Sequence, residues 1–563
     1  MATEFTEYHK KLVKRHAALT SERSSWISHW QEISDYLLPR SGRFFASDRN
    51  RGGKRHNSII DSTGTRALRV LAAGLLAGMT SPARPWFRLS IKDTELADYD
   101  PVKRWLADVT MVMQQVFSRS NTYRALHSMY GEVGAFGTGA AILLPDYNNV
   151  IHNYTLTTGE YCIATDYQGR VNTLYRQFEK TVGEIVREFG KENCSTTVQN
   201  MFNDGNLDNW IPLIHVIEPR ADREYGKTDA KNMAFKSCTF EGAGTPDKYL
   251  RESGFKRFRA LVPRWDVAGG DVYGNSPGME ALGDIKSLQQ EQLRKGQGID
   301  YKTQPPLQVP TSLKNQPVSR LPGGLTYVDS PSASGAIHSL WNVDIDLGDL
   351  REDIMDVRQR INQAFFSDVF IMLATSQQTQ MTATEVAERH EEKMLMLGPV
   401  LERLHNELLE PLIEMTFDTM IEAGIVPPAP QELHGVELDV EFVSMLAQAQ
   451  RAIGVNSVDR FTSSLGAIAA IKPDVLDKLD VDRWADHYAD ILGVPPDLIV
   501  PSDQVAMVRQ SRAEVAQQKA MLEAGNVQAD TANKLAGAKT SEPNALDMLN
   551  QFSGYGSPTG VQV

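Results

Sequence analysis

The segment DLGDLREDIMDVRQRINQA, residues 346–364, carries the most regular helical pattern in the chain. Its apolar residues recur at alternating steps of three and four, which places them in one narrow stripe along an α-helix. Helices of this kind are most often core elements of a bundle. A contact between the subunits of a ring is the more specific and less common alternative. The stripe consists of Leu347, Leu350, Ile354, Val357, Ile361 and Ala364.

Acidic residues surround that stripe and raise a further alternative, a metal-dependent nuclease site. They belong to a helix that is patterned for packing, so a solvent-facing or interface role is favoured over metal binding. The carboxylates are Asp344, Asp346, Asp349, Glu352, Asp353 and Asp356.

A second helix is expected upstream, where Ser276 is a suitable N-cap and Pro277 suits the first helical position. It should continue to about Gly296. Its first part is apolar, but the second part is polar, so the helix cannot be buried on all sides. The polar residues are Gln289, Gln290, Glu291, Gln292, Arg294 and Lys295.

The segments around these two helices are also patterned. Residues 301–344 lie between the helices, are rich in proline and glycine, and contain strand candidates at 307–309 and 325–328, which indicates a small β-containing module. A polar segment, 375–380, follows the second helix.

A capping box at Thr382-Ala383-Thr384-Glu385 then predicts the start of another helix. This helix should reach about Ala423. We expect kinks at Gly398-Pro399 and at Pro411, because proline removes a backbone donor and clashes with the preceding turn.

The remaining segments alternate between helical and strand patterns, which predicts a multidomain, mainly helical α+β protein. The final residues are rich in Ala, Gly, Asn, Ser and Thr and predict a frayed tail. Helices are expected at 5–38, 61–79, 105–117, 123–133, 181–189, 444–492 and 504–523, and strands at 87–91, 140–144, 171–178, 210–218 and 436–442.

Charge narrows the range of partners. The 563-residue chain has a formal net charge of -13, which disfavours a protein that grips DNA through a broad basic face. It does not exclude DNA, because a channel through which a duplex slides should avoid strong phosphate contacts. A basic loop at 48–55 has the composition of a solvated loop, with contact to DNA or a neighbouring subunit as the alternative.

Segments that would imply secretion, membrane insertion or a cofactor are not found in the sequence. Cys162, Cys194 and Cys238 are too scattered for a disulfide framework or a zinc cluster, so we expect reduced thiols in a cytoplasm. The charged start lacks the apolar stretch of a signal peptide. The apolar run 67–79 contains Arg69 and is too short to span a bilayer, so it reads as a buried helix.

No catalytic motif stands out either. Gly137-Thr138-Gly139 lacks the following Gly-Lys-Ser/Thr of a phosphate loop, and His390-Glu391 lacks the second histidine of a helical zinc site. A G-x-S-x-G elbow is absent. We therefore expect no enzyme activity and no cofactor.

The order of several short motifs resembles the portal proteins, or head-to-tail connectors, of short-tailed double-stranded DNA phages. The resemblance extends from about Glu22 to Arg512, and its pieces become specific when taken in order. They are Phe136-Gly137-Thr138-Gly139, Tyr273-Gly274-Asn275-Ser276-Pro277, Ala281–Leu288, Met381–Val386, Leu446–Arg451, Leu479–Asp482 and Gly493–Pro496.

The resemblance implies a ring-forming subunit with named regions. The two helices flanking the small module become the stem, and the module becomes the clip. The implied regions are a wing at 1–275, a first stem helix at 276–300, a clip at 301–345, a second stem helix at 346–368, a tunnel loop at 369–381, a long kinked wing helix at 382–426, a returning wing strand at 427–445, a helical crown at 446–523 and a C-terminal tail at 524–563 that is flexible or barrel-like.

The resemblance also implies roles for residues. The DNA channel would be lined by Gln289, Gln292, Arg294, Lys295, Thr375, Gln377, Gln378, Thr379 and Gln380. The packaging motor or the tail adaptors would contact Lys314, Asn315 and Arg320, and ring packing would use the seam Leu347, Leu350, Ile354, Val357 and Ile361.

The implied partners are further copies in a dodecameric ring, double-stranded DNA in transit, the terminase motor, the major capsid or scaffolding protein, and tail adaptor and nozzle proteins. The protein would be made in the host cytoplasm and reside at the portal vertex of the virion, with no membrane insertion. Another phage tail or capsid scaffold protein remains the main alternative, and the metal-dependent nuclease is the weaker one.

Overall fold

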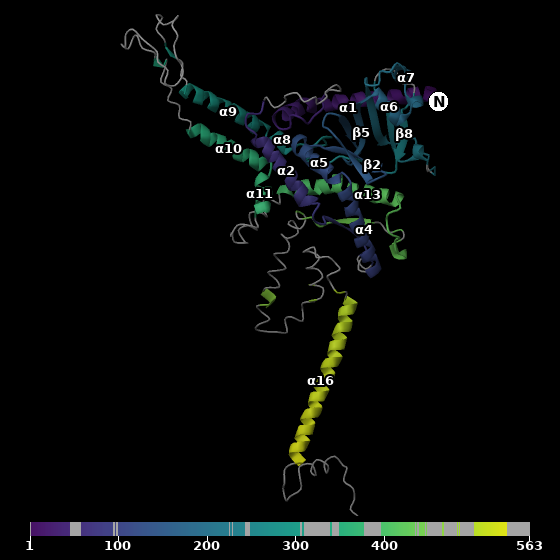
Figure 1. Ribbon diagram of the computed structural model, residues 1–563, viewed down its shortest axis with the longest axis vertical. Helices are drawn as coiled ribbons and strands as arrows, with labels where there is room; N and C mark the ends of the chain where they lie inside the picture. Colours follow the sequence, from purple (N-terminus) through teal and green to yellow (C-terminus); the bar gives the residue numbers. More distant parts are fainter. Residues whose placement is uncertain are drawn as a thin grey trace, which may run out of the picture. The chain divides into compact units, whose positions relative to one another are not determined.

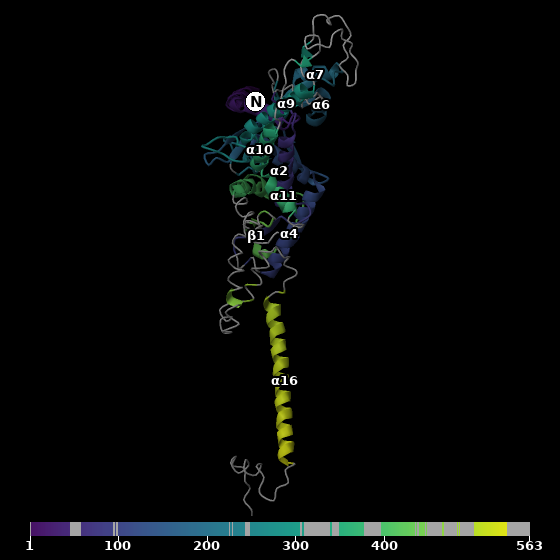
Figure 2. The same ribbon diagram turned by 90° about the vertical axis from the view of Figure 1, so that its left-hand side faces the viewer.

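Figures 1 and 2 show the computed structural model of the chain in two views. The structure describes residues 2–44, 58–93, 96, 99–224, 226–227, 229–242, 248–303, 307–308, 338–339, 348–375, 396–433, 435, 438–444, 446, 464–466, 481, 484, 500 and 502–536.

The chain divides into two compact units, 1–454 and 455–563. In the second unit the main described element is α16 (Ser502–Ala536), a single long helix. Between Gln504 and Leu522 its side chains are exposed, apart from the partly buried Val505.

Helices of the first unit form its core. Apolar residues at helical spacing on α2 pack against α5, and the main core includes Leu71, Leu75, Tyr130 and Phe136. Gly134 permits the close approach, because a Cβ there would lie 2.8 Å from the Leu71 side chain. The helices are α1 (Ala2–Tyr36), α2 (Thr63–Met79), α4 (Asp100–Arg119) and α5 (Thr122–Phe136).

A five-stranded antiparallel sheet, in the order β4-β5-β6-β7-β8, lies beside the first part of α1. Leu12 and Leu19 of α1 pack on Tyr175, Val216 and Phe240 of the sheet. The elements are β4 (Tyr161–Thr165), β5 (Val171–Thr181), β6 (Trp210–Pro219), β7 (Phe235–Glu241) and β8 (Arg251–Phe255), with α6 (Val182–Phe189), η1 (Lys191–Asn193), α7 (Thr196–Asn203) and η2 (Ala230–Asn232) between strands.

Two smaller sheets connect distant parts of the chain. One has the order β3-β2-β9, and in the other β1 pairs antiparallel with β12, so that Phe87 lies opposite Phe442. This second pairing ties the chain that follows α13 (Glu410–Glu422) back to the N-terminal body. The strands are β1 (Phe87–Ile91), β2 (Ala140–Asp146), β3 (Val150–Leu156), β9 (Ala260–Leu261) and β12 (Leu438–Phe442).

Two antiparallel helices, α9 and α10, run side by side and extend away from this body (Figure 1). Of the segment that joins them, the structure describes a short antiparallel pair, β10 with β11. The elements are α8 (Pro277–Glu280), α9 (Leu282–Thr303), β10 (Leu307–Gln308), β11 (His338–Ser339), α10 (Gly348–Ala364) and α11 (Ser367–Thr375).

The helix that precedes β12 changes its hydrogen bonding midway. Residues 396–404 are α-helical, His405–Leu409 form the π-helical segment η4, and α13 (Glu410–Glu422) follows, then η5 (Gln431–Leu433). Pro411 has no N–H to donate to the carbonyl of Glu407, and a π-turn relieves that loss. A departure from α-helical hydrogen bonding therefore lies directly before Pro411, where we expected a kink.

Most expected elements are confirmed, and a few bounds are corrected. The strand at 87–91 and the helices near 5–38, 61–79, 105–117, 123–133 and 181–189 are present. The helix expected to stop near Gly296 continues to Thr303, and α16 continues to Ala536, thirteen residues into the expected tail. The capping box at 382–385, the strand candidate at 325–328 and most of 444–492 lie outside the described residues.

Candidate channel stem

The base of the stem begins where two glycine motifs meet. A Cβ on Gly274 would lie 2.3 Å from the carbonyl oxygen of Gly137, and a Cβ on Gly137 would lie 2.0 Å from that of Gly274. Gly137 also has a φ of 79°, in the left-handed region that favours glycine. The Gly274 N–H donates to the Thr138 hydroxyl at 2.9 Å. Two stretches that lie far apart in sequence therefore form one backbone joint.

Ser276 fixes the direction of the first stem helix from that joint. Its hydroxyl accepts the Met279 N–H at 3.0 Å and donates to the Ala135 carbonyl at 2.7 Å. Pro277 occupies the first turn, and the expected N-cap is confirmed. One side chain thus caps α8 and fastens it to the C-terminal end of α5.

Gln289 clamps α9 to the segment before α2. Its side-chain oxygen accepts the N–H groups of Ile60 and Asp61, each at 2.7 Å, while its nitrogen donates to the carbonyls of Asp61 and Ile285. The residue is buried and all of these partners belong to the same chain. A buried amide with its donors and acceptors satisfied holds two segments at a fixed separation.

Asp61 joins both stem helices to the same place. Its Oδ2 accepts from Arg358 of α10 at 2.6 and 3.1 Å and from Gln292 of α9 at 3.0 Å, and its Oδ1 accepts from Thr63. Burial acts to raise the pKa of this carboxyl, but the hydrogen bonds from Thr63 and Arg358 outweigh burial, and the net pKa is lowered. Asp61 is therefore a charged anchor for both helices.

Two pairs of side chains mark the sides on which α9 and α10 face each other. Arg360 lies 3.5 Å from Asp284 in an ion pair, and Asp353 lies near enough to Glu291 to affect its ionisation. Burial and the neighbouring Asp353 raise the pKa of Glu291, which favours a shared proton between the two carboxyls.

The seam of α10 packs within the chain. Ile354, Val357 and Ile361 are at most 2% exposed and belong to the main core, and Leu350 packs against it. Because these side chains are already covered, they have no surface to offer a neighbouring subunit. Their assignment to ring packing is therefore corrected to bundle packing, while Leu347 lies outside the described residues.

The expected channel-lining residues divide into some that are buried inside the chain and some that are exposed. Gln289 is buried in its clamp, so its assignment to a channel wall is corrected. Gln292 is half-buried, and its amide donates a hydrogen bond to Asp61. Arg294 is exposed and Lys295 is half-buried, as a wall position allows. Thr375 ends α11, and its side chain is not described. Gln377, Gln378, Thr379, Gln380, Lys314, Asn315 and Arg320 lie outside the described residues.

Sequence reasoning missed the charged residues that hold the stem and wing in place. Arg358 is one of several charged residues on α10, and no local pattern links it to Asp61, 297 positions away. Arg264 donates to both oxygens of Glu407, at 2.6 and 3.2 Å, and to the Gly169 carbonyl at 2.8 Å. Glu407 lies in the π-helical segment η4. The nearby Pro411 was the only feature of the sequence that pointed to an irregular helix at this place.

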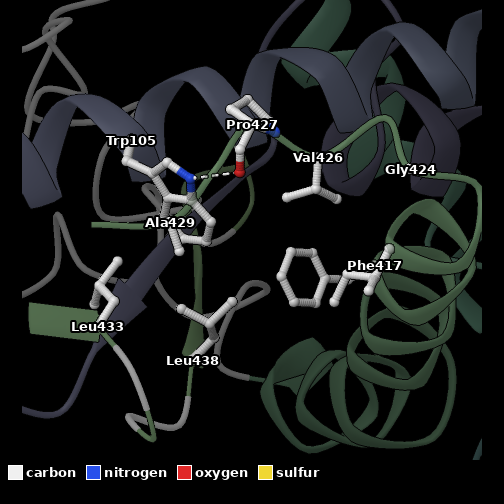
Figure 3. A pocket seen from close by; sticks show the side chains of 9 residues that line it. Trp105, Phe417, Gly424, Val426, Pro427, Ala429, Leu433 and Leu438 are labelled. Atoms are coloured by element: carbon white, nitrogen blue, oxygen red, sulfur yellow. Dashed lines mark hydrogen bonds between the residues drawn. The ribbon is translucent and has the colours of Figure 1, made fainter. Parts of the chain in front are cut away.

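An apolar pocket of about 360 Å³ lies between α4, α13 and the loop before β12 (Figure 3). The Trp105 indole N–H donates to the Pro427 carbonyl at 3.0 Å, and the ring of Phe417 points into the space. The pocket offers no acid, base or nucleophile. Its lining consists of Trp105, Phe417, Ile421, Gly424, Val426, Pro427, Ala429, Leu433 and Leu438.

Metal-binding clusters and membrane-spanning helices are both absent from the described residues. Among them, no group of three or more His, Cys, Asp or Glu side chains is arranged to hold a metal ion. Within the same part of the chain, no helix combines the length and the apolar character that crossing a membrane requires.

Curated proteins from two phages resemble the chain over nearly its whole length. One, described as a probable portal protein of Bordetella phage BPP-1, is 62% identical over 550 residues, which cover 97% of this chain and 99% of the relative. The other, described as the portal protein of Salmonella phage epsilon15, is 44% identical over 546 residues, covering 97% and 98%.

Solved structures are similar at a lower level. A chain from the virion of a native gene transfer agent particle is 12% identical with a TM-score of 0.33, covering 83% of this chain and 99% of that one. A chain from the neck of an empty particle of the same kind is 12% identical with a TM-score of 0.35, covering 81% and 96%.

The family assignment rests on the sequence relatives and on a family model. The model is described as bacteriophage head to tail connecting protein and matches residues 9–500, which include the glycine joint and both stem helices. The chain belongs to the family of bacteriophage head-to-tail connecting proteins.

Proposed function

We propose that the chain is a structural portal subunit, copies of which surround a DNA channel at one vertex of the capsid. Through that channel the genome would be packaged and later ejected, and the head would be joined to the tail. The role is structural, with no chemical step assigned to any side chain. The nearly full-length similarity to two phage portal proteins supports this proposal.

The α9–α10 hairpin is the observation that carries the assignment of a stem. Its base is held by the Gly137–Gly274 joint, Gln289 and the Asp61–Arg358 pair, whereas its outer part carries exposed polar residues such as Arg294. A rigid base with a solvated outer part suits a helix that borders a water-filled channel.

The regions follow from this stem. Residues 276–300 and 346–368 form the stem, 301–345 the clip, 369–381 the tunnel loop and 446–523 the crown, with the remainder in the wing and tail. The clip would meet the terminase motor and later the tail adaptor and nozzle proteins. The wing would meet the capsid or scaffolding protein, in a ring that we take to be dodecameric.

The negative net charge of the chain is compatible with a duplex that slides through the channel. With a net charge of -13, copies of the chain surround the duplex without a dense array of cations that would hold its phosphates. Isolated positive side chains such as Arg294 can orient the duplex while allowing it to slide.

Cryo-electron microscopy of the purified chain and of intact virions tests the proposal. We expect rings with an axial hole wide enough for a duplex, and the same ring at a single vertex of the virion. Filaments, or closed particles without a hole, together with a fivefold capsid protein at every vertex, would reject a portal role and favour the scaffold alternative.

A further inference from the structure

The two outer flanks of the stem hairpin carry large apolar side chains that are exposed and that no described part of the chain covers. Leu293 on α9 is 50% exposed and Met355 on α10 is 57% exposed. The core of the hairpin is already filled by the α10 seam, so these two side chains are not spare core residues.

Helical geometry places the two flanks on opposite sides of the hairpin. The ion pair between Asp284 of α9 and Arg360 of α10 marks the sides on which the helices face each other. Leu293 is nine residues from Asp284 and Met355 is five residues from Arg360, which are rotations of about 180° and 140° around the two helices. Leu293 therefore points away from α10, and Met355 points away from α9.

Each flank also carries one charged residue between its apolar residue and the tip of the hairpin, and the two charges are opposite in sign. Asp300 lies seven residues beyond Leu293 toward the tip of the hairpin, or about 10 Å along α9. On the antiparallel α10, Arg351 lies four residues from Met355 toward the same tip, or about 6 Å. Both charged residues are exposed, and the length of the arginine side chain makes up the difference.

We propose that these flanks are the two halves of a contact between copies of this chain: Leu293 and Asp300 of one copy pack against Met355 and Arg351 of the next. This inference rests on the proposed ring and names the stem residues that join its subunits. It replaces the buried seam of α10 as the stem's contribution to assembly.

A second copy fits these flanks because they differ from each other and point in opposite directions. A contact between two unlike patches of the same chain is heterologous, and repetition of such a contact gives a closed ring when the rotation between neighbouring copies divides a full turn. Copies related by rotation about a common axis keep α9 of one copy antiparallel to α10 of the next. The apolar pair and the opposite charges then meet in the same order.

Disulfide cross-linking can test the pairing, because Cys162, Cys194 and Cys238 are buried and contribute little background. The test uses the full chain with Leu293→Cys and Met355→Cys together, assembled and oxidised. On non-reducing gels we expect a ladder of covalent multimers beyond the dimer. Each single variant should run as a monomer on the same gel, because a disulfide at this contact needs both Leu293→Cys and Met355→Cys.

A matched control places cysteines on exposed residues of the same helices, each rotated about 100° from the flank residue, with Arg294→Cys and Asp356→Cys together. This pair should give no ladder. A ladder from the control that equals that of the test pair would show non-specific collision. Dimers from either single variant would show a twofold contact, and both results would overturn the proposal.

A charge exchange gives an independent measurement that does not depend on cysteines. Asp300→Arg alone should reduce the fraction of ring seen by native mass spectrometry at least tenfold, and adding Arg351→Asp should restore most of it. If the wild-type chain forms no ring, the proposed function fails. If the wild-type rings form while the single variant assembles normally, only this pairing is wrong.

Discussion

The two halves of α9 contrast within one continuous helix. From Leu282 to Gln292 the helix is fastened to the body by buried apolar contacts, the Gln289 clamp and Asp61. From Leu293 to Thr303, every residue is exposed except Lys295 and Gly298. The first half is specified by contacts inside one chain, and the second half presents most of its side chains to solvent. The contrast teaches that the base fixes the geometry of the stem, while its outer half is available for assembly and DNA.

A substitution at the glycine joint should have the largest effect on stability. In Gly274→Ala the new Cβ would meet a backbone oxygen at 2.3 Å, and a backbone atom cannot move aside as a side chain would. We expect a loss of about 3 kcal/mol in the free energy of unfolding, measured by thermal or denaturant melting.

Gly296→Ala in the outer half of α9 is the matched control. A Cβ there meets nothing within 4 Å, so helix propensity alone should raise stability by about 0.5–1 kcal/mol. Equal effects at the two positions would remove the distinction between base and outer half.

The Asp61 anchor should give the next largest effect. Arg358→Ala leaves the buried Asp61 carboxylate without its cation, and we expect a loss of about 2 kcal/mol near neutral pH. The native pKa of Asp61 lies below its ordinary value of 3.8, so the stability it contributes is present above about pH 4 and is lost as the pH falls through the native pKa.

Denaturant melting of the wild type and of Arg358→Ala, repeated from pH 7 down to pH 3, measures this dependence. The difference between them should shrink below about pH 4. Gln359→Ala, at an exposed position of the same helix, should change stability by less than about 0.5 kcal/mol. A difference that does not depend on pH would argue against a charged anchor.

Glu132 lies one turn before Ala135, whose carbonyl accepts the hydrogen bond from Ser276. It should have a smaller effect on the free energy of unfolding than Asp61, with the opposite pH dependence. Burial raises its pKa to about 8, hydrogen bonds from Ser41 and Thr158 oppose that rise, and Glu160 adds to it. Between about pH 4.5 and 8 the native state keeps a proton that the unfolded state releases, so stability falls as pH rises across this window.

Glu132→Gln should remove that fall and raise stability at pH 8 by about 1 kcal/mol, well below the full pKa shift because Glu132 is only partly buried. The measurement is the melting temperature of both proteins from pH 5 to pH 9. Parallel curves would show that Glu132 is already ionised at neutral pH in the native protein.

Changes in the outer half should have the smallest effect on folding and a visible effect on function. Arg294→Gln removes an exposed cation, so the free energy of unfolding should stay within about 0.5 kcal/mol of the wild type. The rate of DNA packaging into procapsids should change while rings still form. Failed assembly of a well-folded Arg294→Gln chain would assign Arg294 to a subunit contact instead of the channel.

Local pattern predicted the elements well because their signals are local. The N-cap at Ser276, the strand at 87–91 and the apolar stripe of α10 each depend on a few neighbouring residues. The extension of α16 past residue 523 was missed because a stretch rich in small and polar residues was taken for a tail, although its alanines favour helix.

Which surface covers a residue was harder to predict, because it depends on the distant segment that arrives there. The stripe Ile354, Val357 and Ile361 fits a bundle core and a ring contact equally well until α9 and α2 are placed beside it. Gln289 looked like a wall residue for the same reason, since its partners Ile60 and Asp61 lie more than 200 positions away.

The Gly137–Gly274 contact also bears on how such genes exchange segments. The close approach is made by backbone atoms, and the side chain that supports it, Thr138, belongs to the first motif itself. A recombinant that joins the first motif of one gene to the second motif of another keeps the contact as long as both glycines survive. A hybrid that exchanges the stem as a block must also keep Gln289 and the Asp61–Arg358 pair, because these side chains join the stem to the body beside the two glycines.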